Sequence, residues 1–499
     1  MSPDLDDVQR IVLHGSPWRA ALHLMVSFDD GAPCRFLHSL RGRISGAGAA
    51  QRPAVQCSLG FTRRGLERAG VPRNVMARLA LKAPAFWSGA AMRAGRHVGL
   101  SGRSAPERWH AAFETDPLDL VISLHGSSDA DLLRVADEIR SSEPARRMRF
   151  DELPLARALE PPQALRQAAQ KEENETGLAP QWVHFGYRDG LTRIGIVGWP
   201  PQAKTKDLLP SSIHQPGEFV LGHVADSGAD PWVAGPGVRV WPQTVRKFFR
   251  NASFGVLQQV VQDVGAFESF VAKAAGQLRH LSATGDTAPG LTDEVKGKLC
   301  GRYPDGRPLA VPGGTQDPKS DFDYSLDPMG FGCPFGSHVR RMNSRTHRPR
   351  DAAPAPAPGG AAHFSRARPL LRRGLPYGPG WEPTTDGGDA GVSPERGLIG
   401  HFFCASIEDQ FEHLLSEWAD RVPLGSDDRG GARDPLIGAH EAADGPFDIP
   451  RPENEQPLKL HGLQAFAHTV GAAYLFYPSI TTLHGIADSE LWREVENDE

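Results

Sequence analysis

The segment 331–345 gathers residue types that bind metals and anions. It reads FGCPFGSHVRRMNSR and contains Cys333, His338, Arg340 and Arg345. Thiolate and imidazole are common metal ligands, and the planar guanidinium of arginine matches carboxylates and phosphates. A zinc site, a nucleic-acid surface and a haem site could each use these residues. The rest of the sequence has to distinguish among them.

Two further short segments combine charged residues with turn residues. GYRDG (186–190) has a glycine at each end and Asp189 inside it. A tight turn is the simplest interpretation, and the small residues would also let another molecule approach the carboxylate. In LLRRGLPYG (370–378), Arg372 and Arg373 precede a Gly/Pro turn. That turn predicts that one guanidinium points inward while the other reaches solvent.

Composition excludes several classes of protein. The chain has 499 residues, of which 39% are hydrophobic and 23% charged, so it can fold around two or three cores. A formal net charge of −5 argues against a dedicated nucleic-acid binder. The five cysteines, Cys34, Cys57, Cys300, Cys333 and Cys404, stand apart without CxxC pairing. This spacing excludes a disulfide framework, a paired-cysteine zinc site and covalent attachment of c-type haem.

The beginning of the sequence gives an expectation about location. It reads MSPDLDDVQRIVLHG, with acids where a secretory signal carries basic residues, and no apolar run follows. No window approaches the roughly 20 uninterrupted apolar residues that a membrane helix needs. We therefore expect a reduced, cytoplasmic protein that does not bind membranes.

Strand and helix patterns alternate in the first third of the chain. Apolar runs predict strands at 21–28, 54–62 and 118–126, and helical spacing of apolar residues predicts helices at 33–44 and 127–142. This order suits an antiparallel sheet with helices on one face, the ferredoxin-like arrangement.

A similar pattern follows in the middle of the chain. Strands are predicted at 218–223 and 252–260, and a helix at 262–278. We therefore expect an α+β protein of two domains, residues 1–165 and 178–499. A polar stretch at 163–177 would join them as a linker helix or loop.

The three charged segments together resemble a known family. GYRDG, GCPFGSHVRRMNSR and LLRRGLPYG, in this order, are similar to the GxxDG, CPxxAHIRRxNPR-like and RRGxPYG-like motifs of the dye-decolorizing peroxidases, which are haem enzymes. The resemblance extends over nearly the whole chain. It includes QPGEFVLGH (215–223), RNASFGVLQQVVQDVGAFESFV (250–271), KGKLCGRYPDGRPLAV (296–311), DFDYSLD (321–327) and IEDQFEHLLSEWADR (407–421).

The resemblance implies a fold and a cofactor. It implies two ferredoxin-like modules, with one haem b (iron protoporphyrin IX) in the C-terminal module. His338 would be the proximal ligand of the iron, and Arg340 and Arg345 would pair with the haem propionates. Glu408, at the start of IEDQFEHLLSEW, would accept a hydrogen bond from the second ring nitrogen of His338. A first-turn acid that favours the helix dipole is an alternative interpretation of Glu408.

The resemblance also implies a reaction. Asp189 would move a proton of hydrogen peroxide, and Arg372 would stabilise the developing negative charge. The resulting iron–oxo intermediate would oxidise dyes, phenols or similar reductants in one-electron steps. Tyr377 and Trp381 are candidates for relaying electrons from bulky reductants, although packed aromatic residues are the simpler interpretation of both.

Other functions stay open from the sequence. A haem carrier or sensor without efficient turnover would need only His338, whereas the presence of Asp189 and Arg372 favours an enzyme. An RNA-binding pair of ferredoxin-like modules is disfavoured by the acidic balance. The chain departs from the family motifs at NSRTHRPRD (343–351), at TRIG (192–195) and at VGAAYLFYPS (470–479). The sequence also leaves room for a homo-oligomer.

Overall fold

The architecture was determined from a computed structural model of the chain. It describes residues 4–14, 18–29, 33–49, 53–113, 118–176, 179–192, 194–199, 208, 212–233, 240–281, 288–311, 322–343, 345, 368–382, 394–420, 433–438, 446–452 and 455–488. Among the helices in these ranges, none combines the length and the apolar character that a membrane crossing requires.

The N-terminal half forms an antiparallel sheet with the order β4-β1-β3-β2. Its elements follow the chain as β1 (Ala20–Phe28), α2 (Cys34–Leu40), β2 (Val55–Phe61), β3 (Leu120–Gly126), α7 (Asp129–Ser141) and β4 (Met148–Glu152). This is the order of elements and of strands in a ferredoxin-like arrangement. Helix α7 begins as its sequence predicts, because the Ser128 hydroxyl accepts a hydrogen bond from the Asp131 backbone N–H.

The C-terminal half repeats this strand order as β16-β10-β13 followed by β12 and β11. Its elements are β10 (Ser253–Gln262), α10 (Val264–Leu281), α11 (Ala288–Cys300), β11 (Leu371–Arg372), β12 (Leu375–Tyr377), β13 (Gly397–Cys404), two π-helical segments (Ile407–Glu412 and Leu414–Ala419) and β16 (Ala467–Tyr477). Every pairing among these strands is antiparallel. The sequence showed no clear internal repeat, yet the two halves share one topology.

The two half-sheets join into a single closed sheet. On one side β16 meets β2 through the pair Phe476 and Phe61. On the other side β12 meets β5 (Ala156–Arg157) through the pair Tyr377 and Ala156. The predicted α+β class is confirmed. The predicted domain limits stay predictions; α8 (Arg166–Thr176) occupies the polar stretch expected to link the halves.

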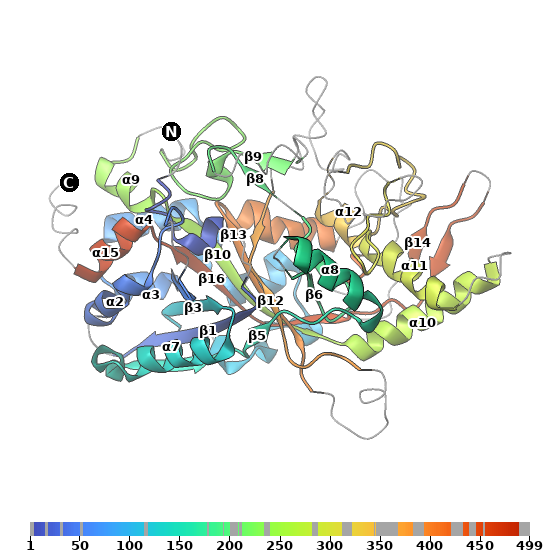
Figure 1. The fold of residues 1–499 in the computed structure, drawn as a ribbon. Coiled ribbons are helices and arrows are strands. Elements are labelled where there is room, and N and C mark those ends of the chain that lie inside the picture. Colours follow the sequence, from blue (N-terminus) through green and yellow to red (C-terminus); the bar gives the residue numbers. More distant parts are fainter. Residues whose placement is uncertain are drawn as a thin grey trace.

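Shorter elements surround this sheet. They are α1 (Arg10–Leu13), α3 (Arg63–Arg68), α4 (Arg73–Lys82), α5 (Pro84–Ser88), α6 (Ala90–Arg93), β6 (Gln181–Trp182), β7 (Arg188–Asp189), β8 (Gly195–Ile196), β9 (Ile213–His214), α9 (Gln243–Phe249), α12 (His338–Met342), β14 (Phe447–Ile449), β15 (Leu458–Leu460) and α15 (Ile480–Asp488). Helices α10, α11 and α12 lie with β14 on one flank of the molecule, away from both termini (Figure 1).

The predicted strand at 218–223 is wrong. Phe219, Val220 and Leu221 are buried in the main hydrophobic cluster, but their backbone forms turns rather than a ladder. Pro216 opens the segment in a short 3₁₀ turn, and Gly222 closes it at a φ of 76°. The apolar run therefore reflects burial of a loop. In the sequence, a buried loop and a buried strand of the same length have the same apolar pattern.

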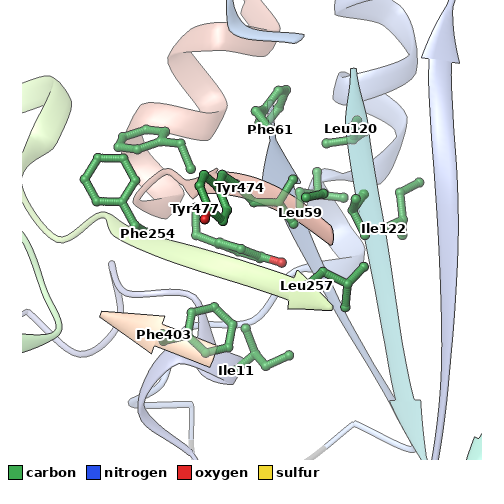
Figure 2. Packing of buried hydrophobic residues seen from close by; sticks show 14 of the residues in the cluster. Ile11, Leu59, Phe61, Leu120, Ile122, Phe254, Leu257, Phe403, Tyr474 and Tyr477 are labelled. Carbon is green, nitrogen blue, oxygen red and sulfur yellow. The ribbon is translucent and has the colours of Figure 1, made fainter. Parts of the chain in front are cut away.

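The main hydrophobic cluster contains residues of both halves. Figure 2 shows Leu59, Phe61 and Ile122 of the N-terminal half near Phe254 and Tyr477 of the C-terminal half. Because the same cluster includes strands of both half-sheets, burial of apolar surface holds the halves together more than their two narrow strand junctions do.

Three buried histidines meet within this core. His23 of β1, His125 of β3 and His401 of β13 have ring centroids 5.6 to 6.3 Å apart, and each is at most 2% exposed. Burial lowers the pKa of His125 to about 4, and it also lowers the pKa values of the other two. All three are therefore neutral near pH 7.

This cluster predicts a loss of stability in mild acid. Between the unfolded pKa of about 6.5 and the folded pKa of about 4, unfolded His125 binds a proton that the folded residue does not. The free energy of unfolding should thus fall as pH falls through this window, by up to about 1.4 kcal/mol per pH unit for each such group. Urea unfolding at pH 7, 6 and 5 would measure the slope.

His125→Gln should have a smaller slope than the wild type, whereas His97→Gln, at an exposed position, should keep the wild-type slope. Equal slopes for the wild type and His125→Gln would contradict this account.

Candidate functional site

His338 is held by a carboxylate that lies far from it in the sequence. It is the first residue of α12, and its Nδ1 lies 2.9 Å from Oδ2 of Asp434. Because a carboxylate can only accept, Nδ1 carries the hydrogen and donates it. The lone pair of Nε2 is then left available, and Nε2 makes no hydrogen bond to the described residues. The side chain is 23% exposed, so one edge of the imidazole stays accessible.

Asp434 stays ionised in spite of complete burial. Burial alone would raise the pKa of its carboxyl group, but His338, Arg341 and the Leu436 backbone N–H together lower that pKa below its usual value. Oδ1 accepts hydrogen bonds from the backbone N–H groups of Leu436 and Ile437, at 2.9 and 3.1 Å. The charge that faces His338 is therefore fixed in place by the surrounding backbone.

The prediction that Glu408 accepts the hydrogen bond from His338 is wrong. The carboxylate of Glu408 instead accepts from the Ala85 backbone N–H, at the start of α5. Burial raises the pKa of Glu408. Sequence reasoning missed Asp434 because it lies 96 residues from His338, in an acidic, Gly/Pro-rich stretch without a motif.

Arg340 shapes the loop that leads to His338. Its guanidinium donates to Oδ2 and to the carbonyl of Asp327, at 3.0 and 2.9 Å, and lies over the rings of Tyr324 and Phe335. Asp327 also accepts from the backbone N–H of Cys333. Arg340 is 3% exposed, and these contacts give it a structural role in the loop. Its predicted pairing with a haem propionate stays a prediction.

Two other residues of this segment are buried as well. Arg345, at a φ of 51°, donates to the Phe322 carbonyl and lies over that ring, with 1% exposure. Its predicted contact with a propionate stays a prediction. Cys333 is fully buried, and burial raises the pKa of its thiol, which keeps it neutral. Cys333 therefore behaves as a small apolar residue and not as a metal ligand.

Asp189 and Arg372 come together as an ion pair. Nη2 of Arg372 lies 3.3 Å from Oδ1 of Asp189, and the two side chains are 48% and 42% exposed. The tight turn predicted at 186–190 lies earlier in the chain: the Gly186 N–H, at a φ of 83°, donates to the Val183 carbonyl, and Asp189 belongs to the short strand β7 that follows. Because 42% of the Asp189 side chain is exposed, its carboxylate is open to an approaching molecule.

The two consecutive arginines point in different directions, as the sequence predicted. Arg372 faces Asp189, whereas the guanidinium of Arg373 donates to the backbone carbonyls of Ile11 and Val12 at 3.0 and 2.9 Å. Burial, together with the charge of Arg372, lowers the pKa of Arg373 to about 9. Arg373 thus fixes the backbone of β11 against the N-terminal half and leaves Arg372 free to orient toward Asp189.

Both charged segments are attached to the same end of α11. The Tyr187 hydroxyl donates to the Lys296 carbonyl at 2.8 Å, and the Ser337 hydroxyl donates to the Lys298 carbonyl at 2.5 Å. These carbonyls are two residues apart, about 3 Å along the helix axis. Asp189 and His338 each lie within two residues of such an anchor. No hydrogen bond or ion pair among the described residues joins His338 directly to Asp189 or Arg372.

The two candidate relay residues are less exposed than a surface role suggests. Tyr377 is 2% exposed, and its hydroxyl donates to Oε1 of Glu395 at 3.1 Å. Trp381 is partly buried and packs against the second hydrophobic cluster, which includes α10 residues. The structure therefore places both as packed aromatic residues, and their part in electron transfer stays a prediction.

Comparison with known proteins identifies the chain's relatives. No protein-family model matches it. It is 24% identical over 329 residues to the dye-decolorizing peroxidase msp1 of Mycetinis scorodonius, and 27% identical over 338 residues to a dye-decolorizing peroxidase of Mycena epipterygia. Each match covers 61% of this chain, and 56% and 57% of the relatives. The chain thus spans less than two thirds of the length of these relatives.

Solved structures agree over almost the full length. A DyP-type peroxidase of Auricularia auricula-judae matches 98% of this chain and all of its own, with a TM-score of 0.73 and 22% identity. Another DyP structure matches 97% of this chain and 98% of its own, with a TM-score of 0.75 and 20% identity. The chain is thus a distant relative of dye-decolorizing peroxidases in sequence and has their fold. At these identities the structural likeness shows the fold alone, and the site of this chain rests on its own residues.

The residues of this dye-decolorizing peroxidase homologue fit the haem that the family implies. A histidine that binds haem iron presents the lone pair of one ring nitrogen, and Nε2 of His338 makes no hydrogen bond to the described residues. The charged acceptor on Nδ1 fixes the tautomer and orientation of the ring, as in other histidine-ligated metal sites. The thiol of Cys333, which is buried and neutral, offers no competing ligand.

A matched pair of variants tests which carboxylate serves His338. Asp434→Asn keeps an acceptor for Nδ1 but removes the charge, so haem affinity should fall on the order of 10–100-fold, and the haem reduction potential should rise. Glu408→Gln should leave both unchanged. Haem titration and potentiometry measure these quantities. The opposite ranking of the two variants would restore Glu408 as the partner.

Proposed function

We propose that this protein is a haem-dependent peroxidase that uses hydrogen peroxide to oxidise dyes, phenols or similar reductants in one-electron steps. The observation that carries the proposal is the ion pair between Asp189 and Arg372, 3.3 Å apart and half-exposed. Simple haem binding needs only His338. An acid and a fixed cation side by side, attached to the same helix end as His338, suit cleavage of a peroxide bond.

His338 and Asp434 would hold the cofactor in the C-terminal half. Nε2 of His338 would bind the iron, and the Asp434 carboxylate would hold the ring in the orientation that this requires. When bound, the haem supplies the oxidising chemistry. The strand order of each half supports two ferredoxin-like modules, and the cofactor would lie in the second of them.

Asp189 would move the proton. Its Oδ1 is engaged by Arg372, whereas Oδ2 makes no hydrogen bond to the described residues. Oδ2 can accept a proton from one oxygen of hydrogen peroxide and return it to the other oxygen, which departs as water. One carboxylate then acts first as a general base and then as a general acid.

Arg372 would supply a fixed positive charge. A deprotonated peroxide and a departing hydroxide both carry negative charge, and a guanidinium already in position stabilises them without reorganisation. The backbone of β11 is fixed by Arg373, whose guanidinium is tied to Ile11 and Val12. The N-terminal half therefore contributes to catalysis by positioning Arg372.

Organic reductants are the proposed second substrate. A related dye-decolorizing peroxidase has been solved in complex with 2,6-dimethoxyphenol. We extend this substrate class to the present chain, with Tyr377 and Trp381 as electron relays for molecules too bulky to reach the haem. A cytoplasmic location, inferred from the sequence, belongs to the same proposal.

The haem-carrier alternative predicts a different response to peroxide. A carrier binds haem through His338 but leaves the haem absorption spectrum unchanged when one equivalent of hydrogen peroxide is added. A peroxidase changes that spectrum rapidly and then oxidises an added phenol.

Replacing His338 tests the ligand assignment. His338→Ala should lose haem or hold it weakly, because it removes the neutral imidazole that Asp434 orients. The haem-to-protein absorbance ratio of purified protein measures this. Cys333→Ser is the control from the same segment and should keep the ferric spectrum. Full haem content and an unchanged Soret band in His338→Ala would refute the assignment.

Replacing the ion pair tests the division of labour. Asp189→Asn should slow reaction with peroxide by about 10²–10⁴-fold. Arg372→Leu should raise the barrier by roughly 2–4 kcal/mol, with the larger effect of the two, because water can replace a missing base but nothing small replaces a fixed charge. Stopped-flow absorbance at matched pH gives both rates.

Haem should stay bound in both variants. Asp151→Asn, on the exposed strand β4, is the control and should react at the wild-type rate. Wild-type rates in both Asp189→Asn and Arg372→Leu would place the reaction elsewhere.

A further inference from the structure

Gln410 is a buried residue whose side chain joins three segments of the chain. It is 2% exposed and lies in the first of the two π-helical segments. Its Oε1 accepts hydrogen bonds from the backbone N–H groups of Ala405 and Ser406, at 3.0 and 2.9 Å. Its Nε2 donates to the carbonyls of Glu218 and Pro369, at 3.0 and 2.6 Å. Both donor and both acceptor positions of the amide are therefore used.

The contact with Pro369 is important because of the strand that follows it. Pro369 is buried and, as a proline, lacks a backbone N–H, so its carbonyl is the one backbone group through which a hydrogen bond can hold it. Strand β11 begins two residues later and consists of Leu371 and Arg372, at the end of the sheet path. Its pairing with β13 covers two residues, which fixes a strand weakly. Gln410 therefore holds the chain where it enters the strand of Arg372.

A second contact holds the same entry point. The guanidinium of Arg368 donates through Nη1 to the carbonyl of Asp409, the residue before Gln410. Beyond the strand, the guanidinium of Arg373 donates to backbone carbonyls of α1 in the N-terminal half. Arg372 thus stands between two anchors, and the anchor that precedes it comes from the segment of Gln410.

The segment that carries Gln410 also reaches the His338 side of the proposed site. The two π-helical segments follow each other with one residue between them. At their far end, the Ala419 carbonyl accepts a hydrogen bond from the Asp434 backbone N–H at 2.7 Å. One continuous stretch of backbone therefore contacts both Asp434, which holds His338, and the strand that carries Arg372.

We propose that Gln410 is a positioning residue, which fixes the strand of Arg372 relative to the pair formed by His338 and Asp434. Two neighbouring N–H groups need an acceptor at this place and two carbonyls need donors, and a glutamine amide offers both at the required length. The inference rests on the proposed peroxidase function. It gives Gln410 no contact with peroxide or haem.

A fixed charge depends on its placement. The guanidinium of Arg372 is 48% exposed, so the backbone that carries it, and not a surrounding shell of side chains, determines where it lies. A positive charge stabilises developing negative charge without reorganisation only if it is already in position. A displacement of about 1 Å can slow a reaction on the order of 10²-fold.

Two substitutions of Gln410 test the inference in the haem-loaded protein. Gln410→Glu has the same shape and keeps the acceptor for Ala405 and Ser406, but it loses the N–H groups that hold Glu218 and Pro369. Gln410→Asn adds no charge, and its amide is too short to join the same groups. Both should slow the reaction with hydrogen peroxide on the order of 10–100-fold, measured by stopped-flow absorbance. The kcat/KM for an added phenol, which reports the later reduction steps, should not change.

A double-mutant cycle distinguishes positioning of Arg372 from general support of the fold. If Gln410 acts through Arg372, Gln410→Glu should change the peroxide rate by less than about twofold once Arg372→Leu is present. Equal slowing in both backgrounds, or no slowing in the wild-type background, would overturn the inference.

Hydrogen exchange gives a readout that does not depend on turnover. In the full chain without haem, backbone N–H groups of peptides that cover β11 should exchange faster in both Gln410 variants, because the entry of the strand is released. Peptides that cover β2 should exchange as in the wild type. Faster exchange throughout the chain, which includes the case that both variants are unfolded, or unchanged exchange at β11, would show that Gln410 does not position this strand.

Gln258→Glu is the matched control. It also places a carboxyl group at a buried glutamine of the C-terminal half, whose Nε2 donates to Oγ1 of Thr469 at 2.8 Å. This variant should react with peroxide at the wild-type rate. Slowing as large as that of Gln410→Glu would refute the positioning role, since a buried charge alone would then explain both results.

The single substitution Arg372→Leu separates this inference from the proposed function. A wild-type peroxide rate in Arg372→Leu refutes the role given to Arg372, and the inference with it. A slow reaction in Arg372→Leu together with a wild-type rate in both Gln410 variants refutes the positioning role alone.

Discussion

An ionised carboxylate in a fully buried position, Asp434, is the constraint on which the candidate site depends. Burying a charge without partners is costly, and here the backbone N–H groups of Leu436 and Ile437 and the imidazole of His338 satisfy it. These hydrogen bonds fix the backbone around the site as well as the orientation of the His338 ring. Since the Asp434 backbone N–H also donates to the Ala419 carbonyl, the segment that follows β13, the 433–438 turn and α12 are tied at one point. Because these hydrogen bonds fix the position of Asp434, they also fix the direction in which Nε2 of His338 points.

The positive charge of the site, the guanidinium of Arg372, depends on contacts with the N-terminal half. Arg372 belongs to the C-terminal half, but its neighbour Arg373 reaches two carbonyls of α1 near the start of the chain. Substitutions in α1 therefore act on the site without touching it. The buried His23, His125 and His401 occupy the same border between halves, and their low pKa values keep this region uncharged around Arg373. A further cation there would compete with the charge that Arg372 presents.

Local patterns in the sequence were enough for much of the fold. The strands β1, β2, β3 and β10, and the capped helix α7, were predicted within one or two residues, because apolar runs and the Ser128 cap depend on near neighbours. The run at 218–223 failed because a buried loop and a strand have the same apolar signature. Motif resemblance brought Asp189 and Arg372 together correctly. It missed Asp434 and put Glu408 in its place, because the partners of buried charges are chosen by tertiary contacts that no local spacing records.

The closed sheet constrains how the chain can fold while it is being synthesised. Phe61 of β2 finds its partner only when Phe476 of β16 has been made, 415 residues later by their numbers. At roughly 5–20 residues per second on the ribosome, the edge of the N-terminal half-sheet stays unpaired for about 20 to 80 seconds. An unpaired edge is a template for intermolecular strand addition, so nascent chains on neighbouring ribosomes are the first hazard this topology meets.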